Sequence, residues 1–200
     1  AILEPGLKTL EELCGIPVAG VIPYTHVDID DEDSLTERFG RSTERKLLDI
    51  AVIRVPRISN FTDFSPFEHY ENVSLRYVDQ VSDLHRPDMI LLPGTKSTIA
   101  DLRWLRQSGL EAAILKAADA GTLIFGVCGG YQMLGQYYKT WDGQQCDFTG
   151  ALDLYTVGSE QRMIGNYMFT CDEADCKIVG FENHSGKTYL GSGVKPLGKI

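Results

Sequence analysis

The chain has 200 residues, of which 43% are hydrophobic and 24% charged, as is typical of one globular domain or of one domain with a fragment of another. Its 28 acidic and 19 basic residues give a formal net charge of −9, which disfavours binding to nucleic-acid phosphates or to an anionic membrane. No apolar run approaches the ~18 residues of a transmembrane helix, and the first residues lack the pattern of a secretion signal. We therefore expect a cytoplasmic protein with no membrane insertion and no nucleic-acid partner.

The first part of the chain has little of the pattern of a folded core. Residues 7–15, LKTLEELCG, carry leucines at helical spacing and end in glycine, which predicts a short helix. A short apolar strand punctuated by glycine and proline is expected in residues 15–24, an acidic loop in residues 28–33 and a charged helical connector in residues 36–49. We interpret residues 1–45 as a linker or tail and not as a self-sufficient domain.

From residue 46 onward, strand patterns alternate with helical patterns. The expected strands cover residues 49–55, 73–78, 88–92 and 122–127. One helix is predicted over residues 98–120, with Gly121 as its C-cap, and another begins at Tyr131. This alternation predicts an α/β domain with a mostly parallel sheet flanked by helices. Beyond residue 141 the chain is richer in strand patterns, over residues 150–156, 163–170 and 177–181.

The cysteines favour reduced thiols over a disulfide framework, because their number is odd and no secretion signal precedes them. The five are Cys14, Cys128, Cys146, Cys171 and Cys176. Cys171 and Cys176 have the spacing C-x4-C, with only His184 nearby to assist them. A structural zinc site normally has four protein ligands, so we expect no metal site here.

Cys128 lies where a predicted strand meets a predicted helix, and Gly129 and Gly130 follow it in the stretch GVCGGYQMLG. Such a tight corner is typical of a nucleophile elbow, in which the helix N-terminus favours a thiolate and a backbone N–H can hold an oxyanion. Gly129 would supply one such N–H. Gly94, at the end of the neighbouring predicted strand, would supply the second. The alternative is a small hydrophobic residue in a tight turn, and the glycine-rich corner favours the nucleophile.

This stretch resembles the nucleophile motif of class I glutamine amidotransferases, in the branch that contains cobyric acid synthase. Residues 55–68 (VPRISNFTDFSPFE) and 91–111 (LLPGTKSTIADLRWLRQSGLE) are similar to the same branch, as are the first residues of the chain. The resemblance implies a flavodoxin-like class I amidotransferase fold, in which Cys128 hydrolyses glutamine through a thioester. It also implies that residues 1–45 are the tail of an ATP-dependent synthetase domain, and residues 46–200 the amidotransferase domain.

In that family the released ammonia amidates corrinoid carboxylates in cobalamin biosynthesis. The resemblance therefore implies that glutamine is bound by this chain, with ATP and Mg²⁺ bound by the synthetase domain or a partner and no cofactor in the chain itself.

The last third of the chain is more similar to the glutaminase subunit of lipid II isoglutaminyl synthase. The similar stretches are YYKTWDG, GALDLYT and GFENHSGKTYLG. This second resemblance implies that Arg162 contacts glutamine, and Gln132 in the nucleophile motif is the other expected substrate-binding residue. It also leaves open a different acceptor, a cell-wall lipid precursor amidated by a ligase partner.

A glutaminase needs a base beside the sulfur, and the sequence supplies no clear one. His184 is the candidate, with Glu182 two residues away to orient it, while the other histidines (His26, His69 and His85) lie in the linker or in loops. In both similar families the catalytic histidine comes later, in a YLHG-type motif that is not found before Ile200. Two interpretations follow: an amidotransferase domain that is incomplete at its C-terminus, or a non-catalytic binding subunit.

Overall fold

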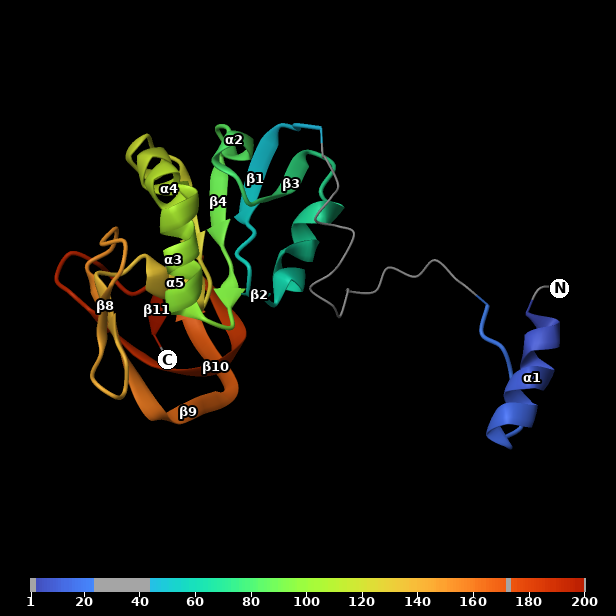
Figure 1. Ribbon diagram of the computed structural model, residues 1–200. Coiled ribbons are helices and arrows are strands. Elements are labelled where there is room, and N and C mark those ends of the chain that lie inside the picture. Colours follow the sequence, from blue (N-terminus) through green and yellow to red (C-terminus); the bar gives the residue numbers. More distant parts are fainter. Residues whose placement is uncertain (1–2, 24–43, 172–173, 200) are drawn as a thin grey trace. The chain divides into compact units, whose positions relative to one another are not determined.

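The computed structural model describes residues 3–23, 44–171 and 174–199 (Figure 1). The chain divides into two compact units, residues 1–30 and residues 31–200, and each is described by itself.

The first unit contains helix α1 (Glu4–Cys14). It ends at Gly15, which has a left-handed φ of 66° and donates its N–H to the Glu11 carbonyl at 2.9 Å. The helix and its glycine cap are therefore confirmed. The strand expected in residues 15–24 is wrong for the described residues, because 17–23 form no regular element. Proline has no backbone N–H to donate to a neighbouring strand, and glycine weakens a strand, so this segment is a poor strand former. The acidic loop and residues 36–43 of the charged connector lie outside the described residues. For residues 44–49 the expected helix is wrong, because they are irregular until a strand begins at Leu48.

The second unit is built around a parallel sheet of four strands in the order β3-β1-β4-β6 (Figure 1). These are β1 (Leu48–Ile53), β3 (Val73–Val78), β4 (Met89–Leu92) and β6 (Leu123–Gly126). All four predicted strands and their parallel arrangement are confirmed. In β1 every side chain after Leu48 is buried, as the run of apolar residues predicts for a central strand covered on both faces.

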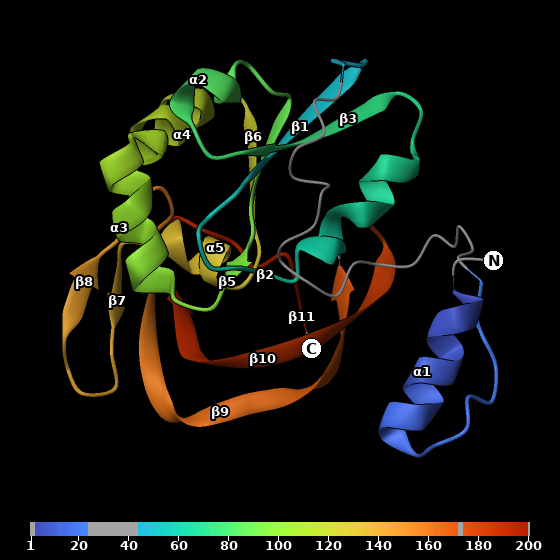
Figure 2. The same ribbon diagram turned by 45° about the vertical axis from the view of Figure 1, so that its right-hand side comes forward.

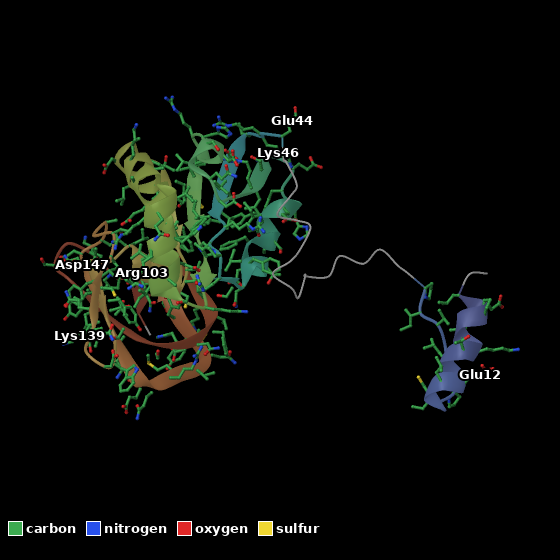
Figure 3. All side chains as sticks on the ribbon, in the orientation of Figure 1. Glu12, Glu44, Lys46, Arg103, Lys139 and Asp147 are labelled. Carbon is green, nitrogen blue, oxygen red and sulfur yellow. The ribbon has the colours of Figure 1, made fainter. Side chains whose placement is uncertain are left out.

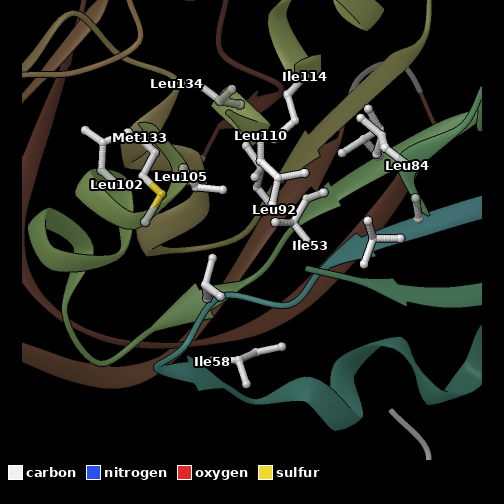
Figure 4. Close-up of a cluster of buried hydrophobic side chains, with 14 of the residues drawn as sticks. Ile53, Ile58, Leu84, Leu92, Leu102, Leu105, Leu110, Ile114, Met133 and Leu134 are labelled. Atoms are coloured by element: carbon white, nitrogen blue, oxygen red, sulfur yellow. The ribbon is translucent and has the colours of Figure 1, made fainter. Parts of the chain in front are cut away.

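Helices cover this sheet from two sides (Figure 2). On one side are α2 (Val81–Leu84), α3 (Thr98–Ser108), α4 (Leu110–Asp119) and α5 (Gly129–Met133), and on the other is the 3₁₀ helix η2 (Phe61–His69). The larger core lies under α2–α5 and includes Ile53, Leu84, Leu92, Leu102, Leu105, Leu110, Ile114 and Met133 (Figure 4). The smaller core, under η2, includes Val52, Phe64, Leu75 and Leu91. The predicted α/β class is confirmed.

The single helix predicted over residues 98–120 is wrong, because Gly109 divides it into α3 and α4. Gly109 has φ 79°, a left-handed conformation that ends α3 and that glycine adopts without a steric penalty. The apolar periodicity continues across the break, since Leu105 of α3 and Leu110 of α4 are both buried in the same core. Periodicity alone therefore could not reveal the interruption.

A second sheet follows α5, with strand order β10-β9-β7-β8 and β11 paired to β9. Its strands are β7 (Tyr137–Lys139), β8 (Gln145–Asp147), β9 (Leu154–Cys171), β10 (Cys176–Leu190) and β11 (Gly198–Lys199). The predicted β-rich region is confirmed, although two of its expected strands are parts of the one strand β9. Charged side chains project outward from the helices and from this sheet, including Arg103, Lys139 and Asp147 (Figure 3). No helix in the described part of the chain is long and apolar enough to cross a membrane.

A buried ion pair joins β1 to β3 at the amino end of the parallel sheet. Asp49 is 2% exposed and accepts hydrogen bonds from Arg76 Nε at 2.7 Å, Arg76 Nη2 at 2.9 Å and Ser74 Oγ at 3.1 Å. Burial by itself raises the pKa of Asp49, but the hydrogen bonds and charge of Arg76, with smaller contributions from the Ser74 hydroxyl and the Arg45 charge, hold that pKa below its ordinary value. The carboxylate is therefore stabilised in its charged form.

Replacing Arg76 with methionine is expected to reduce the free energy of unfolding at pH 7 by about 3 kcal/mol, because it leaves the Asp49 charge buried and unpaired. A depressed folded-state pKa contributes stability that is present above the unfolded value of about 4 and is lost as the pH falls through the lower folded value. The difference between wild type and Arg76→Met should therefore shrink below about pH 4. Urea unfolding at a series of pH values measures it. Asp79→Asn is the control: Asp79 pairs with Arg54 at 3.7 Å, and the two side chains are 42% and 41% exposed. Its free energy of unfolding should stay near that of wild type. A difference between wild type and Arg76→Met that does not depend on pH would contradict this account.

Candidate active site

Cys128 lies in a strained corner between β6 and α5. It has φ 48° and ψ −111°, and its side chain is exposed. A non-glycine residue in such a conformation costs about 1–3 kcal/mol and persists only where its surroundings hold it. Here the Val127 N–H donates to the Leu92 carbonyl at 2.9 Å, and the Gln132 N–H donates to the Cys128 carbonyl at 3.0 Å. The corner therefore has the conformation of a nucleophile elbow, with the thiol directed to solvent and not into the core.

Two glycines allow α5 to approach the parallel sheet closely at this corner. A Cβ atom added at Gly130 would lie 2.1 Å from the Leu92 carbonyl oxygen, and one added at Gly126 would lie 2.6 Å from Tyr131 Cα. Both obstacles are backbone atoms, which cannot move aside as a flexible side chain can. The corner that presents Cys128 thus depends on the absence of side chains at these two positions.

Gly130→Ala is accordingly expected to destabilise the second unit by about 3 kcal/mol or more, because the new methyl group overlaps the β4 backbone. Urea denaturation measures the loss. Gly180→Ala in β10 is the matched control: no heavy atom lies within 4 Å of its added Cβ, so its midpoint should stay near that of wild type. Equal midpoints for the two variants would show that α5 can shift away from β4 without cost.

Gly94 lies close to Cys128, and its predicted role as an oxyanion donor stays a prediction. After β4 and Pro93, the chain forms the short strand β5 (Gly94–Thr95), which pairs antiparallel with β2 (Ile58–Ser59). A Cβ added at Gly94 would lie 3.8 Å from Cys128 Cβ, and one added at Gly129 would lie 3.4 Å from the Thr95 nitrogen. The structure therefore brings together the ends of two neighbouring parallel strands, where ligands of α/β sheets bind.

The pairing of β5 with β2 determines which backbone N–H groups face the thiol. The Lys96 N–H donates to the Arg57 carbonyl at 3.0 Å, and hydrogen-bonded pairs alternate with non-bonded pairs along an antiparallel ladder. Ser59 and Gly94 are therefore a bonded pair, which directs the Gly94 N–H toward β2. The Thr95 N–H points the opposite way, toward Gly129. The Gly129 N–H itself has no acceptor in the part of the chain that the structure describes.

The buried carboxylate of Asp101 holds β2 and β5 in place beside Cys128. Asp101 in α3 is 0% exposed, and its Oδ2 accepts from Thr95 Oγ1 at 2.5 Å and from the Arg57 N–H at 3.1 Å. Its Oδ1 accepts from Arg57 Nη1 at 2.9 Å. Asp101 thus joins α3 to the segments that carry β2 and β5. Sequence reasoning missed Thr95, Arg57 and Asp101, because nothing in the pattern of residues 98–120 marks this carboxylate as buried.

Gln132 lies in α5, four residues after Cys128, and is only 9% exposed. Its Oε1 accepts from Thr98 Oγ1 at 3.4 Å, and its Nε2 lies 2.8 Å from the position of a Cβ added at Gly186. Gln132 therefore bridges α3, α5 and β10 as a buried side chain. Its predicted role in binding substrate stays a prediction.

His184 and Arg162 both lie on the β9–β10 ribbon. His184 Nδ1 is 2.8 Å from the Gly186 carbonyl oxygen and Nε2 is 3.1 Å from Glu182 Oε2, so the orienting role expected of Glu182 has a geometric counterpart. Both ring nitrogens of His184 thus have partners on their own ribbon, and neither is hydrogen-bonded to the Cys128 thiol. Arg162 is exposed and donates from Nε to Asn183 Oδ1 at 2.6 Å. Its contact with glutamine stays a prediction.

No hydrogen bond joins the Cys128 thiol to a histidine within residues 44–171 and 174–199, and His26 lies outside the described residues. All five cysteines are free. In the described ranges, no three His, Cys, Asp or Glu side chains are grouped so as to hold a metal ion. The described residues thus form a strained corner with an exposed thiol, and in this part of the chain no histidine is hydrogen-bonded to the sulfur.

Known proteins with similar sequences and folds place the chain in a family. The profile of the CobB/CobQ-like glutamine amidotransferase domain matches residues 49–200. The cobyric acid synthase of Lachnoclostridium phytofermentans is 50% identical over 198 residues, which cover 95% of this chain and 38% of the relative. That of Ruminiclostridium cellulolyticum is 47% identical over 195 residues, covering 95% of this chain and 37% of the relative. The chain therefore spans well under half the length of these relatives, and the similarity includes its last third.

Solved structures agree on the fold. A crystal structure of a glutamine amidotransferase matches with a TM-score of 0.62 at 17% identity, covering 76% of this chain and 79% of the other. PurLQS from Thermotoga maritima matches with a TM-score of 0.59 at 18% identity, covering 76% and 74%. At these identities the likeness shows the fold alone. Together with the sequence matches and the Cys128 corner, it establishes that this chain belongs to the CobB/CobQ-like glutamine amidotransferase domain family.

Proposed function

We propose that the chain is the glutaminase part of a cobyric acid synthase-like enzyme, with Cys128 as its nucleophile. The observation that carries this proposal is the strained corner itself, where an exposed thiol at φ 48° faces the edge formed by Gly94 and Thr95. Strained backbone at a strand–helix junction is typical of catalytic nucleophiles. Membership of an amidotransferase family supports the side-chain amide of glutamine as the substrate for that thiol.

In the proposed reaction, Cys128 Sγ attacks the side-chain amide carbon of glutamine. The carbonyl oxygen becomes an oxyanion, which the N–H groups of Gly129 and Thr95 would stabilise. The pairing of β5 with β2 supports Thr95 over the neighbouring Gly94 as the second donor. The carbon–nitrogen bond then breaks, ammonia leaves with the thiol proton, and a γ-glutamyl thioester remains. Water hydrolyses the thioester, which releases glutamate and restores the thiol.

The ammonia would be consumed by an ATP-dependent synthetase domain or partner in the cytoplasm that amidates carboxylates. The relatives carry the name cobyric acid synthase over nearly the whole of this chain, so we propose corrinoid carboxylates of cobalamin biosynthesis as the acceptor. ATP and Mg²⁺ would bind to that synthetase. Residues 1–45 would be the tail of its domain and residues 46–200 the amidotransferase domain.

A second candidate is a non-catalytic subunit that binds glutamine without hydrolysing it. The contacts of both His184 ring nitrogens with Glu182 and Gly186 favour this candidate, because neither nitrogen is hydrogen-bonded to the thiol. Glutamine-dependent release of glutamate by the protein would exclude the candidate. Glutamine binding without such release would support it.

The acceptor is tested by following nitrogen from amide-labelled glutamine. The protein is supplied with ATP, Mg²⁺ and either a corrinoid carboxylate with a corrinoid synthetase or a cell-wall lipid precursor with its ligase. We expect heavy nitrogen in the corrinoid amide and none in the lipid. Transfer to the lipid alone would contradict the corrinoid proposal while leaving the glutaminase chemistry intact.

A further inference from the structure

Two cysteines face each other across the β9–β10 ribbon. The register of the two strands pairs Cys171 directly with Cys176, and the next pairs, Thr170 with Lys177 and Phe169 with Ile178, keep the same register. Directly opposed residues of an antiparallel pair lie on the same face of the sheet. The two thiols are therefore neighbours by virtue of strand pairing as well as by their closeness in the sequence.

The spacing of such a pair suits a disulfide. Opposed Cα atoms in an antiparallel ladder are about 4.5 or 5.5 Å apart, and disulfides span Cα separations of about 4.4–6.8 Å. The Cβ atoms of opposed residues, about 4.5–5.5 Å apart, would approach by roughly 1 Å to reach the usual disulfide separation. Such an approach is small, and the register that places the two cysteines face to face is already formed by the folded ribbon.

The two thiols differ in access. Cys176 is exposed, whereas Cys171 is 4% exposed and lies in the middle of three strands, with Gly198 of β11 paired on its other side. A dissolved reagent can therefore reach Cys176 but is screened from Cys171. An exposed thiol with a shielded neighbour is an arrangement in which the first reacts with a reagent and the second resolves the product.

We propose that Cys171 and Cys176 form a dithiol modification site that low-molecular-weight disulfides convert into a cross-strand disulfide. The Cys176 thiolate attacks one sulfur of the reagent, forming a mixed disulfide and releasing one reagent thiol. The Cys171 thiolate then attacks the Cys176 sulfur and releases the second reagent thiol. The two cysteines together lose two electrons and two protons, and the reagent disulfide gains them as two thiols.

The consequence for the fold is local. The bond would join the last residue of β9 to the first residue of β10, next to the pairing of β9 with β11. Because the bridged loop is short, the bond constrains the unfolded chain less than a long-range disulfide would. We therefore expect slower hydrogen exchange at the tip of the ribbon, with little change in the unfolding of the parallel sheet.

The test uses the intact chain and oxidised glutathione at about 0.1 mM, below the roughly 1 mM effective concentration of a tethered thiol. Exchange is quenched in acid, the free thiols are then blocked with excess alkylating reagent near neutral pH, and the chain is cut with trypsin. The fragment of residues 163–177 contains Cys171 and Cys176 and no other cysteine. We expect two forms of this fragment: one with an internal disulfide, two hydrogen atoms lighter and not alkylated, and one that carries glutathione. The first should be at least about tenfold more abundant than the second.

Two controls separate the register from mere proximity in the sequence. Treatment in denaturing urea removes strand pairing and should lower the ratio of internal to mixed disulfide by about tenfold; an equal ratio in folded and unfolded chains overturns the proposal. Cys171→Ser should trap glutathione on Cys176, while Cys176→Ser should leave Cys171 reduced. A wild-type fragment that carries glutathione on Cys176 beside an alkylated Cys171, or a bond from either cysteine to Cys128, also overturns it.

Discussion

Replacing Cys128 with alanine is expected to lower glutamine hydrolysis by roughly a thousandfold or more, with almost no change in the midpoint of urea unfolding. The thiol is exposed, so its removal leaves no cavity in the core. Alanine at φ 48° bears the same backbone strain as cysteine, and the glycines that allow the turn are unchanged. The variant therefore removes the attacking atom while the corner that presents it remains. Release of glutamate from glutamine measures the effect.

Cys146→Ala is the matched control for this prediction. Cys146 is a half-buried thiol in β8, opposite Tyr138 of β7, and it takes no part in the corner. Its replacement should leave hydrolysis within about twofold of wild type. Hydrolysis that survives in Cys128→Ala, or that falls equally in both variants, would show that Cys128 is not the nucleophile.

The second large effect is expected from Asp101→Asn, which should reduce the free energy of unfolding by about 2–4 kcal/mol. Both carboxylate oxygens of Asp101 accept hydrogen bonds, one from Thr95 Oγ1 and the Arg57 N–H and the other from Arg57 Nη1. An amide group has one oxygen and one donating nitrogen, so in either orientation it sets a donor against a donor. Urea unfolding measures the loss of stability.

The same substitution is expected to act on catalysis through the position of Thr95. Because Asp101 holds the segment whose N–H we assign to the oxyanion, a loosened segment should lower kcat more than it raises KM for glutamine. Asp119→Asn, at the exposed end of α4, is the control and should leave stability and kcat near wild type. A loss of stability in Asp101→Asn with kcat unchanged would confine Asp101 to a structural role.

Most of the parallel sheet could be predicted because its strands are mainly apolar runs or, at residues 73–78, alternate apolar with polar residues. Residues 73–78 were expected as a strand and form β3 with those bounds, and the Cys128 corner follows from a strand, two glycines and a helical pattern in succession. The division of residues 98–120 at Gly109 was missed, although a glycine is a helix-stop signal, because both helices bury residues with the same spacing in one core. Local periodicity reports the buried face of a helix and not its continuity.

The parts of the site that could not be predicted depend on contacts between distant segments. Asp101 meets Arg57 across 44 positions of the sequence, and neither residue stands out in its own surroundings. The choice between Gly94 and Thr95 as oxyanion donor depends on the pairing of β5 with β2, which has only two residues in each strand. By contrast, Gly94 and Cys128 could be brought together in advance, since both end neighbouring parallel strands.

The central claim is that Cys128 is the nucleophile of a glutamine-binding site, and covalent labelling tests it most directly. The protein is treated with a diazoketone analogue of glutamine, and the modified residue is found by peptide mass mapping. We expect a single adduct on Cys128, formed more slowly in the presence of glutamine but not of asparagine. Labelling that follows exposure alone, with Cys14 and Cys176 modified as readily and no protection by glutamine, would contradict the claim.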